Sequence, residues 1–449
     1  MSVQPPSPGV EKNIVFPEIE EGRLSNGLRI LVVSNSRLPR ISVKLFFPVG
    51  RISNPDDNLS LASLALELLK SGTQGRSAEE ISDLMDQHAI QFKTDVLMEH
   101  AYMSMTLLED HVETALDLLS DLVLNPIFSG KELEKVKIRW RSQIIAQRSQ
   151  PGFLADESVA KTFYPDHPYS RVSITEKDLK RSTSEKVAQM YREHFAPSRA
   201  FLLFTGRVNL EQAVEWAEQF LGIWEGEPVE LPDFPEPATV EQRIVNLIHR
   251  PHSVQSQILI GSKGLPKDDP DFISLKMANQ VLGGGASARL FLNLREDKGY
   301  TYGAYSRLKS FCSDGILLAG ASVRSEVTVE SVEEVLKELQ FMREKVAKKE
   351  ELDRAQSELI GSFIRQMESP ISVGELEVER RFNRLPEDYY RNFIPALRQT
   401  DLDSVLQMAK RFFDPERTVI TVVTDRGKVE DDLGAFGKLR VFDTEGNRI

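Results

Sequence analysis

A proline-rich, acidic segment at residues 226–242 (GEPVELPDFPEPATVEQ) divides the chain into two halves. Four of its residues are proline and five are acidic, which is typical of an extended linker rather than of a packed element. Each half has about 205 residues, close to the usual size of a domain. The sequence therefore predicts an N-terminal tail at residues 1–19, domains at 20–225 and 244–449, and a linker at 226–243.

The two halves share one order of predicted elements: two strands, two helices, two strands, several helices and a last strand. In the first half, alternating and helical apolar patterns predict strands at 28–33, 41–47, 90–94, 100–107 and 200–204, and helices at 59–70, 78–87, 111–124 and 131–148. In the second half they predict strands at 244–249, 255–261, 300–307, 316–323 and 418–423, helices at 271–282 and 288–296, and three or more helices within 328–412. This order predicts an α+β fold of two structurally similar domains, each a mostly antiparallel sheet with helices packed on one face.

Composition excludes several classes of protein. With 41% apolar and 28% charged residues, the chain resembles an ordinary soluble globular protein. A net charge of −12 argues against a nucleic-acid binder, and no apolar run reaches the roughly 18 residues that span a bilayer. The single cysteine, Cys312, excludes an internal disulfide, and its apolar neighbours predict a buried, unreactive thiol.

The most specific segment of the second half is LGGGASARLFLNLREDKGYTY, residues 282–302. Its three glycines, Gly283, Gly284 and Gly285, stand between two predicted helices, where they allow close backbone approach and positive φ. Arg295 ends the following helix, and Tyr302 lies seven residues later in the next strand. A helix–turn–strand corner can direct both side chains into one cleft. The alternative is a surface arginine and a tyrosine packed on a helix.

A helix in the first half, within residues 61–73 (LASLALELLKSGT), contains no histidine. Its leucines and alanines follow the spacing of a core-facing stripe. The seven histidines of the chain are scattered, and none pair at helical spacing within a plausible helix. Since a catalytic zinc needs about three protein ligands and an open position, the sequence predicts no zinc site in this chain.

Together these features resemble the pitrilysin/insulinase family of zinc peptidases, in the half-size, two-domain form related to mitochondrial processing peptidase. The resemblance covers roughly residues 24–423. It rests on the opening turn LSNGL at 24–28, the pair Gly72-Thr73, and the glycine-rich segment with Arg295 and Tyr302. It implies two similar α+β domains and a second chain that closes with the first around a peptide.

In the family a His-x-x-Glu-His helix and a later Glu bind zinc and activate water. Matching Gly72-Thr73 to the end of that helix places Ser63, Leu66 and Glu67 at the three motif positions and Gln143 at the later one. The resemblance thus implies a degenerate metal site. It also implies that Arg295 holds a peptide carbonyl, that Tyr302 donates to the oxyanion, and that the three glycines contact the substrate backbone.

The resulting hypothesis is a non-catalytic, substrate-binding subunit of a heterodimeric zinc endopeptidase. The hypothesis places no cofactor in this chain and expects zinc in a homologous partner chain. The expected substrates are unfolded peptides. In isolation, a homodimer is the alternative to the heterodimer. Two alternatives remain: a structural or assembly subunit, and a stand-alone protein that captures peptides at a sheet edge. The proline-rich start and family habit favour the periplasm and leave the cytoplasm as the alternative.

Overall fold

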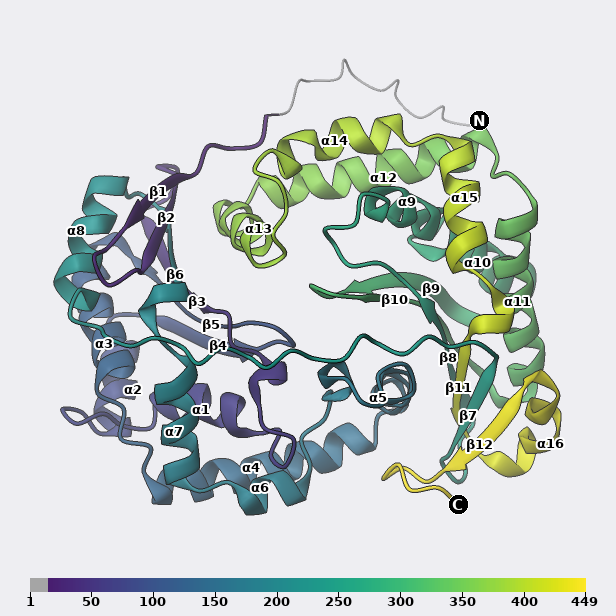
Figure 1. Ribbon diagram of the computed structural model, residues 1–449, viewed down its shortest axis with the longest axis horizontal. Coiled ribbons are helices and arrows are strands. Elements are labelled where there is room, and N and C mark those ends of the chain that lie inside the picture. The colour runs from purple at the N-terminus through teal and green to yellow at the C-terminus, as the bar shows by residue number, and fades with distance from the viewer. Residues whose placement is uncertain (1–14) are drawn as a thin grey trace, which may run out of the picture.

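The computed structural model describes residues 15–449, so residues 1–14 of the predicted tail lie outside the described part. The described chain forms two six-stranded sheets, one in each half, with helices around them (Figure 1). The prediction of two similar α+β units is confirmed. None of the helices within residues 15–449 combines the length and the apolar character needed to cross a bilayer.

The first sheet has the strand order β1-β2-β6-β3-β5-β4. Only β2 and β6 run parallel, and every other neighbouring pair is antiparallel. The strands are β1 (Glu20–Arg23), β2 (Arg29–Ser34), β3 (Arg40–Phe47), β4 (Gln91–Val96), β5 (Ala101–Leu108) and β6 (Phe201–Gly206). The strand β4 lies at one edge of this sheet, so its outer backbone groups are free of strand partners.

The helices of the first half include α1, whose apolar residues are buried against α4 and α7. The helix α2 begins at a capping box, in which the Ser77 hydroxyl accepts from Glu80 N at 3.2 Å and Glu80 accepts from Ser77 N at 2.8 Å. The helices are α1 (Leu61–Leu69), α2 (Ala78–Gln87), α3 (Val112–Leu124), α4 (Gly130–Arg148), α5 (Pro151–Phe163), α6 (Glu176–Arg181), α7 (Ser184–His194) and α8 (Leu210–Leu221).

The second sheet has the order β12-β7-β11-β8-β10-β9, with β12, β7 and β11 parallel and the rest antiparallel. Its strands are β7 (Ile244–His249), β8 (Gln255–Lys263), β9 (Thr301–Ser310), β10 (Gly315–Arg324), β11 (Val419–Thr424) and β12 (Lys438–Phe442). Its helices are α9 (Phe272–Gly283), α10 (Arg289–Phe291), α11 (Thr328–Glu344), α12 (Lys349–Met367), α13 (Pro370–Phe382), α14 (Tyr389–Gln399), α15 (Leu402–Phe412) and α16 (Glu430–Leu433). A π-helical turn at Leu292–Asp297 continues α10.

The two halves exchange helices. The helix α5 of the first half packs on β8 and β11 of the second sheet, while α13 of the second half packs on β2 and β6 of the first. Successive residues of a strand point to opposite faces of the sheet. On the first sheet, Leu31 and Leu203 pack with Val373 of α13. Their neighbours Val32 and Leu202 point to the other face and belong to the main core. Each sheet therefore has the predicted helices on one face and a helix of the opposite half on the other.

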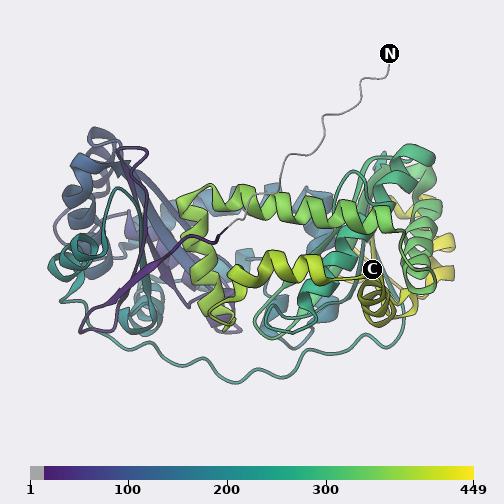
Figure 2. The same ribbon diagram turned by 90° about the horizontal axis from the view of Figure 1, so that it is seen from above.

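Two glycines permit this close packing. A Cβ added to Gly374 on α13 would overlap the side chain of Leu203 on β6. A Cβ added to Gly261 on β8 would lie 2.9 Å from both Phe163 and Val159 of α5. Figure 2 shows the light-green helices of the second half reaching across to the first.

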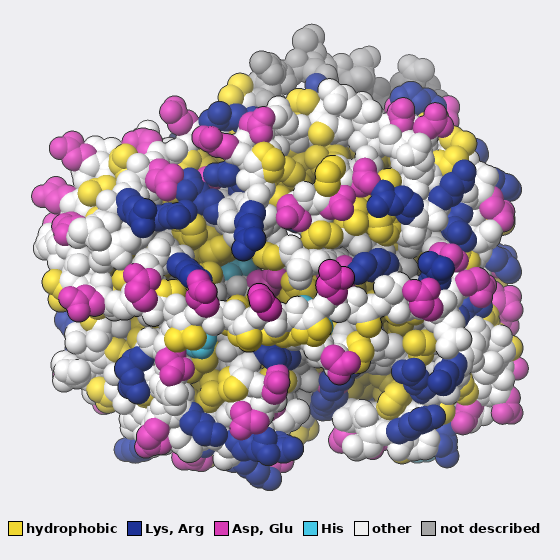
Figure 3. Space-filling view, viewed as in Figure 1, with side chains coloured by type: hydrophobic (Ala, Val, Ile, Leu, Met, Phe, Trp, Pro, Cys, Tyr) yellow, Lys and Arg dark blue, Asp and Glu magenta, His cyan; other side chains and the backbone are white. Residues whose placement is uncertain are grey.

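Residues 226–243, the predicted linker, contain neither helix nor strand. They cross the molecule from one half to the other, and in Figure 3 this band carries several Asp and Glu side chains and has hollows beside it (Figures 1–3). The domain boundaries at 225 and 244 stay a prediction, since the exchanged helices pack on the sheet of the other half.

The prediction of a buried Cys312 is wrong, because the residue is exposed. It lies in the turn between β9 and β10, where Phe311 is buried and the next residue faces outward. Its backbone N–H donates to both carboxylate oxygens of Glu99, at 2.9 and 3.1 Å. The Sγ atom lies 3.5 Å from the carbonyl oxygen of Phe382. The residue therefore belongs to the contact between the two halves.

Candidate functional site

One cavity of about 460 Å³ in the first half collects all four positions that the resemblance assigns to the degenerate metal site. Ser63, Leu66 and Glu67 reach it from α1, and Gln143 reaches it from α4. Its other lining residues are Arg51, Thr94, Asp95, Val96, Arg139, Trp140, Ile144, Gln147 and Ile174. The structure thus brings together residues that are up to 80 positions apart in the sequence.

The residues of this cavity do not fit a zinc ion. Arg139 donates a hydrogen bond to the Glu67 carboxylate, and Lys70 Nζ lies 3.5 Å from the same oxygen. The charge of the Glu67 carboxylate, the one acidic side chain at a position expected for a ligand, is thus already neutralised by two cations. The side chain of Leu66 has no group that can activate water. Within residues 15–449, no cluster of three or more His, Cys, Asp or Glu side chains is placed to hold a metal.

Arg51 is the least compensated charge of this cavity. Its Nη1 donates to the carbonyl oxygen of Val172 at 3.1 Å. Burial lowers the pKa of the Arg51 guanidinium below its ordinary value, and the attraction of Asp95 offsets only part of that effect. Because Asp95 is itself exposed, water screens its charge. The cavity therefore contains a partly desolvated cation with spare N–H donors.

Arg295 and Tyr302 lie around one corner of the second half, and neither lines this cavity. Arg295 stands in the π-helical turn, with its guanidinium 4.6 Å from the ring centre of Phe291 and its Nε 3.4 Å from Glu296. Gly299, at φ +63°, turns the chain into β9. Tyr302 follows at the start of that edge strand and is 94% exposed. Single π-helical turns often occur at functional sites.

The three glycines of this segment serve packing. A Cβ on Gly283 would lie 2.7 Å from the Ser306 hydroxyl, and one on Gly285 would lie 2.7 Å from the Glu358 carboxylate. None of Gly283, Gly284 and Gly285 has a positive φ, so that part of the expectation is wrong. Their contact with a substrate backbone stays a prediction.

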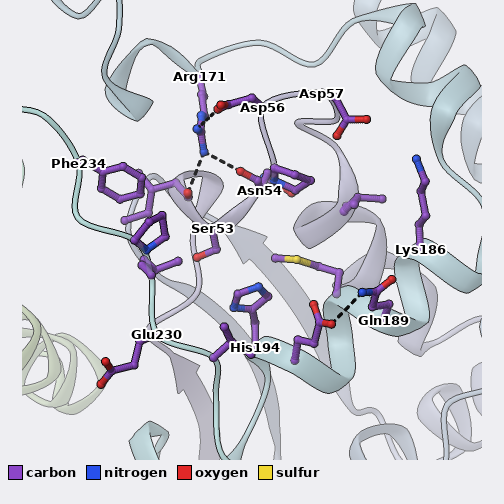
Figure 4. Close-up of a pocket in the computed structure, with 18 residues that line it drawn as sticks. Ser53, Asn54, Asp56, Asp57, Arg171, Lys186, Gln189, His194, Glu230 and Phe234 are labelled. Atoms are coloured by element: carbon purple, nitrogen blue, oxygen red, sulfur yellow. Dashed lines mark hydrogen bonds and ion pairs between the residues drawn. The ribbon is translucent and has the colours of Figure 1, made fainter.

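A second cavity, of about 470 Å³, lies where linker residues 229–234 dock against α7 (Figure 4). Arg171 donates to the carbonyl oxygens of Ile52 at 2.8 Å and Asn54 at 2.6 Å, and also to the Asp56 carboxylate. Burial lowers the pKa of His194, which favours its neutral form. Sequence reasoning missed this cavity because its walls come from distant segments. The Arg171 guanidinium is therefore committed to contacts within the protein.

Fold and site together define a protein of two α+β units, in which the cavity between α1 and α4 has no set of side chains within residues 15–449 placed to hold a metal. The family model described as insulinase (peptidase family M16) matches residues 29–176, and the model described as peptidase M16 inactive domain matches residues 181–359. The chain belongs to the M16, or insulinase, family. It has the half-size, two-domain form.

Known relatives agree with this assignment. The chain is 25% identical over 354 residues to an uncharacterized zinc protease, YmxG, of Bacillus subtilis, covering 77% of this chain and 83% of the relative. It is 22% identical over 407 residues to the non-peptidase homolog YmxG of Helicobacter pylori, covering 89% and 92%. A crystal structure of a peptidase M16 inactive domain from Pseudomonas fluorescens superposes with a TM-score of 0.82 at 24% identity, covering 90% of this chain and 98% of that one. The structural likeness concerns the fold alone.

Proposed function

We propose that this protein is a non-catalytic, peptide-binding subunit that completes the active site of a zinc-bearing M16 partner. The partner supplies the metal and the base that activates water. This chain supplies Arg295 and Tyr302. The assignment follows the family resemblance, in which half-size chains without the zinc motif pair with chains that carry it.

The observation that carries the proposal is the exposure of Tyr302. A tyrosine ring usually buries its apolar body, yet this ring is 94% exposed on an edge strand beside the π-helical turn of Arg295. Within residues 15–449, the guanidinium of Arg295 has a single carboxylate neighbour, Glu296, at 3.4 Å. Both groups are therefore free to meet a peptide held between two chains.

The chemistry suits peptide hydrolysis. Arg295 presents a permanently charged fork that can hold a peptide carbonyl oxygen. Tyr302 presents an O–H donor for the oxyanion that forms when water attacks, and one such donor is typically worth about 3 kcal/mol in the transition state. The free edge of β9 offers backbone groups that can pair with an extended, unfolded peptide.

The test is a cleavage assay on a complex with a half-size M16 chain that carries His-x-x-Glu-His. We expect Tyr302→Phe and Arg295→Ala each to lower kcat about 100-fold while the complex stays assembled. Tyr305→Phe, on the same strand, is the matched control and is expected to leave kcat unchanged. Unchanged cleavage by both variant complexes contradicts the proposal.

A second candidate function is stand-alone peptide binding. It is favoured by the two sheet edges at β4 and β9, which can each take up an extended chain without any partner subunit. Tight binding of an unfolded peptide by the isolated chain, with no cleavage in any complex, is the result that selects this function over the first.

A further inference from the structure

Several polar side chains that line the cavity at the degenerate metal site have unused hydrogen-bonding groups within the described chain. Within the described chain, the side chains of Ser63, Gln143 and Gln147 make no hydrogen bond. The Arg51 guanidinium has five N–H donors, and its hydrogen bond to Val172 uses one of its nitrogens. Polar groups that line a cavity without internal partners are available to a ligand.

The charge of Arg51 favours an anion. Two cations, Arg51 and Arg139, and two carboxylates, Glu67 and Asp95, line the cavity. Asp95 is exposed, so water screens its charge. Arg139 and Lys70 both lie beside Glu67, so the positive charge without a close partner is that of Arg51.

The volume of the cavity and its apolar lining suit one end or one side chain of a larger ligand. A volume of about 460 Å³ is within the range of small-ligand sites. Apolar side chains complete the lining: Leu66, Val96, Trp140, Ile144 and Ile174. Gln143 and Gln147 are exposed, so the cavity opens to solvent along α4. Such a site can take a charged end group with its aliphatic stem.

We infer that this cavity binds a carboxylate of a peptide, with Arg51 as its anchor and the amide of Gln143 as a further donor. An arginine fork matches the two oxygens of a carboxylate, and the amide and hydroxyl groups supply neutral donors beside it. The inference rests on the proposed function in that it takes a peptide as the ligand. It deepens that function, because the cavity at the degenerate metal site would then bind one end or one side chain of the substrate.

A carboxylate has two sources in a peptide: the C-terminus and an acidic side chain. Three fluorescein-labelled hexapeptides of alanine, serine and leucine separate them. The first ends in a free carboxylate, the second is C-terminally amidated, and the third is amidated with one serine replaced by glutamate. Fluorescence anisotropy measures their Kd for the isolated, full-length chain at low salt.

We expect the free-acid peptide to bind about tenfold more tightly than its amidated twin. Arg51→Gln should remove this difference. Because Arg51 also holds Val172, Gln143→Glu is a second variant: it lies at an exposed helix position and repels a carboxylate without touching the loop. Arg141→Gln and Gln150→Glu, which do not line the cavity, are the matched charge controls and should preserve the difference.

Tight binding of the third peptide assigns the site to acidic side chains, and weak binding assigns it to the C-terminus. Equal Kd values for all three peptides, or a preference that survives both Arg51→Gln and Gln143→Glu, overturn the inference. The assay needs no partner chain. A cleavage result that contradicts the roles of Arg295 and Tyr302 can therefore be distinguished from a binding result that contradicts carboxylate binding in this cavity.

Discussion

Arg139 on α4 donates a hydrogen bond to Glu67 on α1, a residue that the family resemblance assigns to a zinc-ligand position. The pair links two helices that contribute to one cavity wall. The charge of the Glu67 carboxylate is therefore already neutralised by Arg139. This predicts that the metal site cannot be rebuilt by restoring the ligands alone.

The first prediction concerns that restoration. The variant Ser63→His, Leu66→Glu, Glu67→His, Gln143→Glu is expected to bind zinc weakly, because Arg139 then repels the ion. It should also be unstable, since Leu66 is 1% exposed and a carboxylate there is buried. Leu66→Glu alone should lower the free energy of unfolding by about 3 kcal/mol, measured by urea denaturation.

The control for this prediction is Leu66→Met, which conserves volume and should cost less than about 1.5 kcal/mol. Adding Arg139→Gln to the fourfold variant should tighten zinc binding, measured by metal analysis after dialysis. Stoichiometric zinc in the fourfold variant with Arg139 intact contradicts the account.

The second prediction concerns the exchanged helices. Gly374→Ala and Gly261→Ala each place a Cβ against the packed side chains of the opposite half, Leu203 in one case and Phe163 in the other. Overpacking of this kind typically destabilises by about 1–3 kcal/mol, so both variants should melt at lower temperature and be cleaved faster by proteases.

Gly361→Ala on α12 is the matched control, since its added Cβ would meet only ordinary van der Waals contact. It should raise stability by about 0.5–1 kcal/mol, because alanine is the better helix former. If all three variants behave alike, the close approach of the halves does not depend on these glycines.

Much of the fold follows from local pattern. The helix α1 could be predicted because apolar periodicity is a property of a few neighbouring residues. The short edge strands β1 and β12, and the helices α5 to α8, were missed. The face on which α5 packs is set by the second sheet, which a local pattern does not contain.

The candidate site shows the same limit. All four positions came from the family resemblance: Ser63, Leu66 and Glu67 were found by counting back from Gly72-Thr73 along one helix, and Gln143 lies on a later helix. Arg51 was missed, because its importance comes from burial and from the distant Asp95. Arg139 was also missed, since an exposed helix position gives no sign of a partner 72 residues away.

The third prediction concerns pH. Glu157 is 4% exposed and accepts from Arg148 at 2.9 Å and Lys161 at 2.8 Å, and also from Ser173. Burial raises the pKa of this carboxyl, but these hydrogen bonds and charges outweigh it and lower the pKa overall. A lowered folded-state pKa stabilises the fold above the unfolded-state value of about 4.5. This stability is lost as the pH falls through the lower folded-state value.

We therefore expect Glu157→Gln to lower the free energy of unfolding by about 2 kcal/mol at pH 7, measured by urea denaturation. The deficit relative to the parent should shrink below about pH 4, where the parent carboxylate becomes protonated as well. Glu176→Gln removes an exposed pair with Lys180 and should change stability little at either pH. A deficit independent of pH contradicts the assignment.

The fourth prediction concerns Cys312. Although the residue is exposed, its sulfur sits against Phe382 and near Glu99. Desolvation of the sulfur raises the thiol pKa, and the neighbouring Glu99 carboxylate raises it further. Since the thiolate is the reactive form, Cys312 should react with a disulfide reagent at pH 8 more slowly than free cysteine, and its rate should keep rising above pH 9. Glu99→Gln should speed the reaction, whereas Glu113→Gln, at an exposed position in the first turn of α3, should not. If the parent protein reacts as fast as free cysteine, the thiol pKa of Cys312 is not raised and the prediction is wrong.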